Sequence, residues 1–449
     1  MHQLTEKDFP GLDLGDIRRN NRFVSIINRL NEQPGSSIPK FNEGWYDTKA
    51  TYNLFKSKAV NLSAIQQAIC GYGSKQVEGL NKILIAHDIS NISYNDLDAE
   101  GLGYLDNAKG QGILCYSSIA ISTDGIPMSI LYQNTWVRPE EDLGKSYKRK
   151  TRQFEEKESY EWYRGITEVN QLLGKDIEKI HICDRGADIY ELFFSAFEKN
   201  TDLLIRSKHN RKLGDGSHLW DTVSQLPSAG TASLSIPDKT GKKREDIAFE
   251  VRYLNVEILR PLANKSKYES IDLTAIEIKQ IDQLKDWQQE SIHWQLLTTI
   301  SINTVIEALQ CVHWYCLRWL IERFHYVLKS GTKIEELQLK QAESLQKAVH
   351  TYSIVAMRIM QMVYLSRVSP KINCELVLTK EQWMTLYMII HKTKEIPQQQ
   401  PELGIVVKWI GKLGGHLGRK QDGEPGLKTV WRGYRKLCDA TLLYSIMVT

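Results

Sequence analysis

The chain has 449 residues, of which 42% are hydrophobic and 25% charged, and its formal net charge is only +4. This length exceeds one ordinary hydrophobic core and suggests about two to four domains, while the small net charge does not by itself indicate nucleic acid. The start of the chain has no basic, apolar leader and no apolar run reaches about 18 residues, which argues against export and membrane spanning and predicts a soluble, intracellular protein.

The first 72 residues are predicted to be helical. Apolar residues recur at helical spacing over 14–30, a PGSSIP break follows, and two shorter helical stretches come after it. Arginine and lysine residues are distributed along this region. It is therefore either a helical subdomain with an ordinary charged exterior or a DNA-reading module, and the residues alone leave both open.

The pattern changes to strands after Asn81. The segments KILIAHD, ILCYSSIAIS and IPMSILYQN predict a strand and a hairpin. A helical stretch over 154–173 follows, then the short strand KIHICD, a helix, and the strand DLLIRS. This β-β-β-α-β-α-β order matches an α/β, ribonuclease-H-like sheet, in which the first and fourth strands lie side by side.

The segment 213–293 interrupts this order with turn signals and alternating strands, so we expect a β-rich insertion there. The run HWQLLTTI then resumes the core. After the helices that end near 367, residues 369–449 form a further region that is predicted to be mostly helical, with a polar linker and a basic, aromatic end.

The segment 304–336 is predicted to form one long helix. Thr304 and Glu307 are spaced as a capping box, no Gly or Pro follows for two dozen residues, and Gly331 stands where a C-terminal cap belongs. At about 100° per residue, one face carries a polar stripe of Tyr315, Arg318, Glu322 and Lys329. An ordinary surface ion pair between Arg318 and Glu322 would also explain part of this stripe.

A second group of side chains on this predicted helix consists of residue types that bind zinc. Cys311, His313 and Cys316 point in different directions on a helix, and no second pair of ligands follows them. The seven cysteines of the chain are scattered and odd in number, so buried thiols are favoured over a zinc site or a disulfide framework.

Asp88 and Asp184 each follow an apolar strand, where open α/β sheets expose functional groups. Taken singly, either could be a turn former or, for Asp184, the N-cap of the next helix. The combination is more informative: two divalent metals about 3.5–4 Å apart need a set of carboxylates such as two aspartates on adjacent strands and the helical Glu322. Carboxylate oxygens favour Mg²⁺ or Mn²⁺ over softer metals.

These segments resemble the insertion-sequence-four (IS-four) family of bacterial DDE transposases. YCLRWLIERFHYVLK contains the family's signature of Tyr, Arg, Glu and Lys, and the segments around Asp88 and Asp184 resemble those around its two aspartates. The family also has a basic segment after its second catalytic strand, which RSKHNRK resembles. It has a tryptophan that accepts a flipped base, and HWQLLTT resembles the segment around it. Both ends of the chain also resemble the family.

The resemblance implies a cut-and-paste transposase that nicks DNA, forms a hairpin, opens it and joins the transposon to target DNA. It implies a helical DNA-binding domain over 1–72, a catalytic domain over 73–368 with the insertion, and a dimerisation and DNA-contact domain over 369–449. Asp88, Asp184 and Glu322 would be the catalytic residues and hold two Mg²⁺ or Mn²⁺ ions. The expected DNA contacts are Tyr315, Arg318, Lys329, Trp294, Trp319, Arg206, Lys208, Arg211 and Lys212.

The implied partners are double-stranded DNA, with terminal inverted repeats and target sites, and a second copy in a homodimer. No membrane is expected, and the protein would be cytoplasmic and associated with the bacterial nucleoid when bound to DNA. Two alternatives stay open at this point: a catalytically silent, end-binding relative, and a structure-specific nuclease with the same core. Without the resemblance, Trp294 would be a half-buried strand aromatic.

Overall fold

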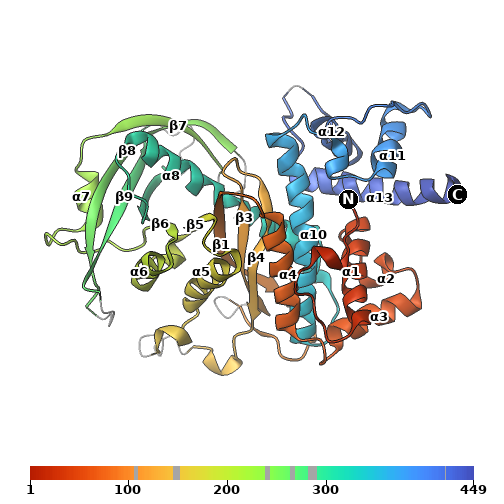
Figure 1. Cartoon of the computed structure of the whole chain (residues 1–449), viewed down its shortest axis with the longest axis horizontal. Coiled ribbons are helices and arrows are strands. Elements are labelled where there is room, and N and C mark those ends of the chain that lie inside the picture. Colours follow the sequence, from red (N-terminus) through yellow and green to blue (C-terminus); the bar gives the residue numbers. More distant parts are fainter. Residues whose placement is uncertain are drawn as a thin grey trace. The chain divides into compact units, whose positions relative to one another are not determined.

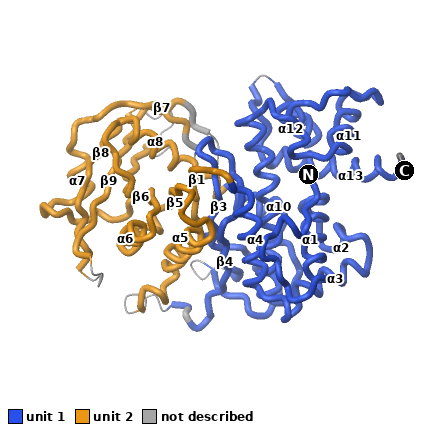
Figure 2. The backbone as a smooth tube through the Cα atoms, in the orientation of Figure 1, with its two compact units in different colours: residues 1–78, 89–147, 323–449 blue, residues 79–88, 148–322 orange. Residues whose placement is uncertain are grey.

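The computed structural model describes residues 1–105, 110–144, 152–237, 243–262, 268–281, 291–419 and 421–448. These residues form a mixed α/β protein with two compact units (Figure 2). Unit 1 comprises Met1–Glu78, Ile89–Tyr147 and Arg323–Thr449, and unit 2 comprises Gly79–Asp88 and Lys148–Glu322. Within the described ranges no helix is both long and apolar enough to span a membrane. All seven cysteines are free thiols, so no disulfide framework forms.

The helices of unit 1 come from both ends of the chain, and those near the start confirm the predicted helical region. The side chain of Asp16 caps the first long helix by accepting a hydrogen bond of 2.8 Å from the Arg18 N–H. The central helix α10 packs against β4, α4, α1 and α12 (Figure 1). The helices are α1 (Ile17–Glu32), α2 (Ile38–Phe41), α3 (Trp45–Lys56), α4 (Leu62–Gln76), α10 (Ala342–Val368), α11 (Lys380–His391), α12 (Leu403–Leu413) and α13 (Leu427–Val448).

The predicted hairpin of unit 1 is confirmed. Strand β3 (Gln111–Ile121) pairs antiparallel with β4 (Pro127–Trp136), and the short strand β2 (Gly103–Tyr104) pairs with the start of β3. Gly125 has a φ of 88° in the connecting turn, a conformation that favours glycine. Nearly every residue of β3 is buried, which explains its continuous apolar run.

Unit 2 is built on a mixed sheet with the strand order β1-β5-β6-β10-β9-β8-β7, to which β1 contributes its residues 82–88. The first three of these strands are parallel, and the others continue antiparallel. The predicted adjacency of the first and fourth core strands is confirmed, because β1 pairs with β5. The strands are β1 (Lys82–Ser93), β5 (Glu178–Cys183), β6 (Asp202–Arg206), β7 (Gly230–Pro237), β8 (Lys243–Leu259), β9 (Ser270–Gln280) and β10 (His293–Thr298).

The predicted β-rich insertion corresponds to α7 (Leu219–Ser224) and the antiparallel strands β7, β8 and β9 (Figure 1). Strand β10 pairs with β6 on one side and with β9 on the other, so the insertion extends the same sheet. Helix α5 (Tyr160–Leu173) leads into β5, and helix α6 (Tyr190–Lys199) connects the parallel strands β5 and β6, as expected for a β-α-β unit.

The prediction of one continuous helix over 304–336 was wrong. The capping box of Thr304 and Glu307 is present, but α8 (Val305–Leu317) ends before Arg318 and α9 (Trp319–Tyr326) begins after it. The Arg318 N–H donates to the carbonyl of Tyr315, three residues earlier, so the hydrogen-bond pattern tightens at this point. A π-helical turn, η7 (Val327–Gly331), follows α9. The left-handed residue after it is Lys333, with a φ of 58°, rather than Gly331.

Candidate active site

The parallel pairing of β1 and β5 places Asp88 and Asp184 at the same level of the sheet. Lys82 pairs with Glu178, an offset of 178 − 82 = 96 residues, and the offset between the two aspartates is also 184 − 88 = 96. Neighbouring strands lie about 4.8 Å apart, so the two carboxylates start from adjacent backbone positions.

Asp88 does not end its strand as predicted, because β1 continues to Ser93. The β1–β5 ladder ends just before it, with the pair Ala86 and Ile182. Asp88 therefore stands where β1 leaves its parallel neighbour, and Asp184 stands where β5 ends.

Asp184 also caps the short turn that follows β5. Its carboxylate accepts a hydrogen bond of 2.7 Å from the Gly186 N–H. A Cβ at Gly186 would lie 2.9 Å from this carboxylate and 3.1 Å from the Trp162 ring, so a larger residue there would displace one of these two side chains. Burial, and then the charge of Asp88, raise the pKa of Asp184, although the Gly186 hydrogen bond and the charges of Arg318 and Lys208 act in the opposite direction. A cation at this position is therefore electrostatically favoured.

Glu322 forms an ion pair with Arg318 across one turn of helix, with 2.5 Å between Oε1 and Nη2. Burial lowers the pKa of the guanidinium, but Tyr315, Asp88 and Glu322 together raise it above its usual value. Arg318 thus acts as a counter-charge to the carboxylates. The part of the chain that the structure describes has no group of three or more His, Cys, Asp or Glu side chains gathered closely enough to hold a metal ion.

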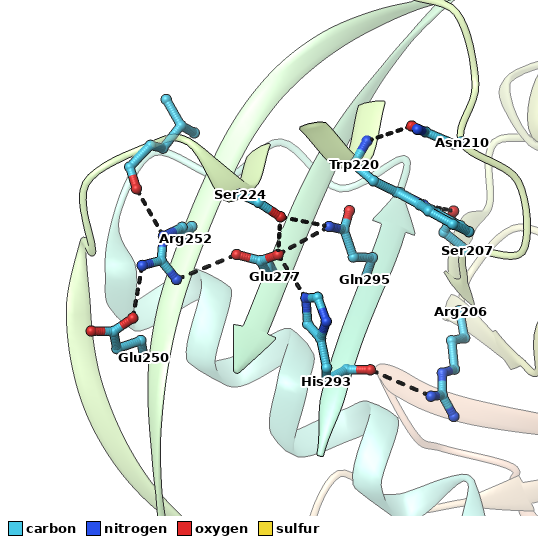
Figure 3. A network of polar contacts seen from close by, with 11 residues as sticks. Arg206, Ser207, Asn210, Trp220, Ser224, Glu250, Arg252, Glu277, His293 and Gln295 are labelled. Carbon is cyan, nitrogen blue, oxygen red and sulfur yellow. Dashed lines mark hydrogen bonds and ion pairs between the residues drawn. The ribbon is translucent and has the colours of Figure 1, made fainter. Parts of the chain in front are cut away.

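Trp294, on β10, lies between a cation and a second aromatic ring. The Arg206 guanidinium is 5.6 Å from its ring centroid, and the Tyr315 ring meets it edge to face at 5.2 Å. Arg206 Nη2 also donates to the carbonyl of His293 at 3.5 Å (Figure 3). Burial raises the pKa of Tyr315 to about 12, so this phenol keeps its proton at neutral pH.

The other predicted DNA contacts are placed differently. Lys208 and Lys212 are exposed, and Trp319 is half-buried at the start of α9. Arg211 is only 8% exposed, because its guanidinium is paired with Asp188. Lys329 belongs to unit 1, in η7, so its place beside Glu322 stays a prediction.

A buried carboxylate in the insertion was missed by sequence reasoning (Figure 3). Glu277 on β9 is 1% exposed, and its oxygens accept hydrogen bonds from Ser224, His293, Gln295 and Arg252, at 2.6, 2.8, 3.0 and 3.3 Å. Burial raises its pKa, but these hydrogen bonds and the nearby positive charges outweigh burial and lower it. The only local signal was a glutamate flanked by the apolar residues Ala275, Ile276 and Ile278.

The register of β9 and β10 connects this carboxylate to Trp294. Glu277 pairs with Gln295, and the side chains of His293 and Gln295 turn to it (Figure 3). Because successive residues of a strand point to opposite faces, Trp294 points away from Glu277. The network therefore fixes both neighbours of Trp294.

Three family models match separate parts of the chain. Residues 1–60 match transposase DNA-binding domains, residues 166–358 match the transposase DDE domain, and residues 354–441 match the dimerisation domain of the Tn5 transposase. The DDE match defines the class of protein, a DDE transposase. With the two flanking matches, the chain belongs to the Tn5-like DDE transposases of the IS4 type.

The DDE match contains Asp184 and Glu322 but begins after Asp88. The place of Asp88 in the site therefore rests on its pairing in the sheet. Among solved structures, the chain is similar to a piggyBac transposase synaptic complex with hairpin DNA, at 10% identity and a TM-score of 0.33. The similarity covers 74% of this chain and 59% of that one.

Proposed function

We propose that this chain is a cut-and-paste DNA transposase that cleaves transposon ends in a metal-dependent reaction and joins them to target DNA. The observation that carries the proposal is the shared register of Asp88 and Asp184, with the charges of Arg318 and Glu322 acting beside them. The DDE-domain match over 166–358 supports it.

In this proposal the catalytic core is ribonuclease-H-like and extends over 73–368, with the insertion within it. The parallel pairing of β1 with β5 and the mixed sheet of unit 2 support this assignment. Residues 1–72 would bind DNA and residues 369–449 would pair two protomers, in agreement with the descriptions of the family models that match these regions.

The carboxylates fit a pair of hard divalent cations such as Mg²⁺ or Mn²⁺. Asp88 and Asp184 offer only oxygen donors, and burial, followed by the charge of Asp88, raises the pKa of Asp184, so a bound cation would stabilise its charged form. Glu322 would complete the set once Arg318 releases it. When bound, the ions would activate water or a DNA 3′-hydroxyl and stabilise the leaving oxygen.

The polar side chains of α8 and its neighbours would hold the DNA backbone. A guanidinium released from Glu322 can donate two parallel hydrogen bonds to a phosphate, so Arg318 would exchange one anion for another. Tyr315 keeps its proton and would donate a hydrogen bond to the same strand. Lys329, Lys208 and Lys212 would add positive charge, and Trp319 a further aromatic contact.

Trp294 would accept a base that leaves the stack when a hairpin forms at the cut end. A tight DNA turn costs a few kcal/mol in lost stacking, and an aromatic ring can offset this cost. The ring is partly exposed, and Arg206 and Tyr315 already hold it in place. An aromatic side chain held in this way is ready to stack on a base.

The proposal is tested by incubating the full chain with Mg²⁺ and a DNA duplex that carries the terminal repeat found beside its gene. Hairpin ends and joined products support a transposase. Nicks without joining would indicate a nuclease with the same core. A gel shift without cleavage would indicate a silent end-binding relative.

A further inference from the structure

Asp188 is a buried acidic side chain near the active site. It lies four residues after Asp184, at the end of the same short turn, and only 4% of it is exposed. A carboxylate removed from water in this way requires hydrogen bonds and a counter-charge.

Among the described residues, the hydrogen-bond partners of this carboxylate come from one loop, residues 207–211. Oδ2 accepts from the N–H groups of Lys208 and His209, at 2.7 and 3.0 Å. Oδ1 accepts a hydrogen bond of 3.0 Å from Nε of Arg211 and a second hydrogen bond from Nη2 of the same side chain. The same Nη2 donates to the carbonyl oxygen of Asp188 at 2.9 Å. The loop is therefore bound to Asp188 through both its backbone and a side chain.

The loop is also held from its other side (Figure 3). The Trp220 N–H donates to the Asn210 side chain at 2.8 Å, and the indole N–H of Trp220 donates to Ser207 Oγ at 3.0 Å. Between these two attachments, Lys208, His209 and Asn210 are exposed. Exposed polar side chains on a loop whose backbone is fixed are suited to holding a charged ligand.

We propose that Asp188 is a positioning residue for DNA: it fixes the 207–211 loop so that Lys208 meets a backbone phosphate beside Asp184, with Arg211 serving as the buried counter-charge and not as a DNA contact. This inference rests on the proposed function, because it requires DNA at the site of Asp184. A purely structural ion pair is the competing explanation, since buried pairs often add little to stability.

The first test uses the unmodified chain and measures amide hydrogen exchange. The amides of Lys208 and His209 lie in an exposed loop, yet both donate to a buried carboxylate. We expect them to exchange on the order of 100-fold more slowly than unstructured amides. Exchange at the unstructured rate would overturn the proposal without any variant.

The second test is a double-mutant cycle with Asp188→Asn, Lys208→Gln and the double variant, read on binding and nicking of end DNA. If Asp188 acts through Lys208, each single variant lowers the slope of log affinity against log salt by about 1. The double variant should then have the same slope as either single variant. Nicking by Asp188→Asn should fall about 10- to 100-fold through misplacement of the strand. A structural role would reduce the folded fraction but leave the salt slope unchanged.

Asp221→Asn is the matched control, because Asp221 accepts from the exposed side of the same loop, from Asn210 at 3.1 Å. It should stay within about twofold of the parent in both readouts. If Asp188→Asn does not fold, Arg211→Lys replaces it in the cycle, since it keeps the charge but loses the two-pronged contact. Additive effects of the two single variants, or an unchanged salt slope, contradict the proposal. A parent chain that neither binds nor nicks the DNA would refute the proposed function itself.

Discussion

Asp184→Asn should stabilise the metal-free protein while removing its response to divalent metal. The asparagine side chain has the shape of the carboxylate, and its oxygen can still accept a hydrogen bond from the Gly186 N–H at the turn. What it removes is a negative charge at the same register as Asp88. The variant therefore isolates the electrostatic cost of a candidate metal ligand.

Burial is the first cause of the raised pKa of Asp184, and the charge of Asp88 is the second. Two like charges separated by roughly the spacing of neighbouring strands, about 5 Å, repel by roughly 3 kcal/mol at an effective dielectric constant of 20. Arg318 and Lys208 offset part of this repulsion, but the pKa of Asp184 is still raised. We therefore expect the free energy of unfolding at pH 7 to rise by about 1 kcal/mol, or roughly 2–4 °C in Tm for a unit of this size.

The sign of the pH dependence is also fixed. Because the folded pKa of Asp184 lies above the reference value of 3.8, the folded state holds this proton longer than the unfolded state does. The parent should thus lose stability as pH rises from that value through the folded pKa, and the variant should lack this loss. Below this window the two proteins should differ little.

The assay is thermal unfolding in EDTA at pH 4 and pH 7, followed by a titration with Mn²⁺. The parent should gain stability with Mn²⁺ because the ion binds only the folded site, and Asp184→Asn should gain much less. Asp202→Asn is the control: burial also raises the pKa of Asp202, but this residue starts β6 and belongs to no proposed ligand set. A variant less stable than the parent at pH 7, or one with the full Mn²⁺ response, would refute the reasoning.

Two further predictions concern the aromatic platform and its support. Trp294→Ala should nick end DNA at the parent rate but give about tenfold less hairpin, whereas Trp294→Phe should be intermediate; an unchanged hairpin yield in sequencing gels would exclude the base-accepting role. Glu277→Gln should lower the free energy of unfolding by about 2 kcal/mol at pH 7, because it removes the buried one of the two carboxylates that pair with Arg252 and weakens the charge-assisted hydrogen bonds to the same side chain. The lowered pKa of Glu277 means that its contribution is present above pH 4.5 and is lost as pH falls through the folded pKa, so denaturant titrations should show the difference between variant and parent shrinking in acid.

The sequence was sufficient to predict the pairing of the two strands that carry Asp88 and Asp184, because local signals and chain order agreed there. Short apolar runs before Asp88 and Asp184, in the order β-β-β-α-β-α-β, predicted that the first and fourth strands are neighbours, and the β1–β5 ladder confirms it. The capping box of Thr304 and Glu307 was equally local and is present. These features depend on residues close together in the chain or on the few ways in which β-α-β units connect.

The features that sequence reasoning missed depend on partners far apart in the chain. Arg211 appeared as one of several basic residues, but it is buried because Asp188, 23 positions away, accepts its hydrogen bonds. The break at Arg318 has no Gly or Pro to mark it, and hydrophobic periodicity does not reveal a change in the hydrogen-bond pattern. Glu277 is buried for the same reason as Arg211: its partners come from other elements of the insertion.

The most direct test of the proposed active site is single-turnover cleavage of end DNA by Glu322→Gln in Mg²⁺. This variant keeps the shape of the side chain and can still accept a hydrogen bond from Arg318, so binding of end DNA in a gel shift should match the parent within about twofold. Cleavage should fall by at least about 1,000-fold, because the amide is a poor ligand for a hard cation. Cleavage at the parent rate would contradict the assignment of Asp88, Asp184 and Glu322 as the catalytic carboxylates.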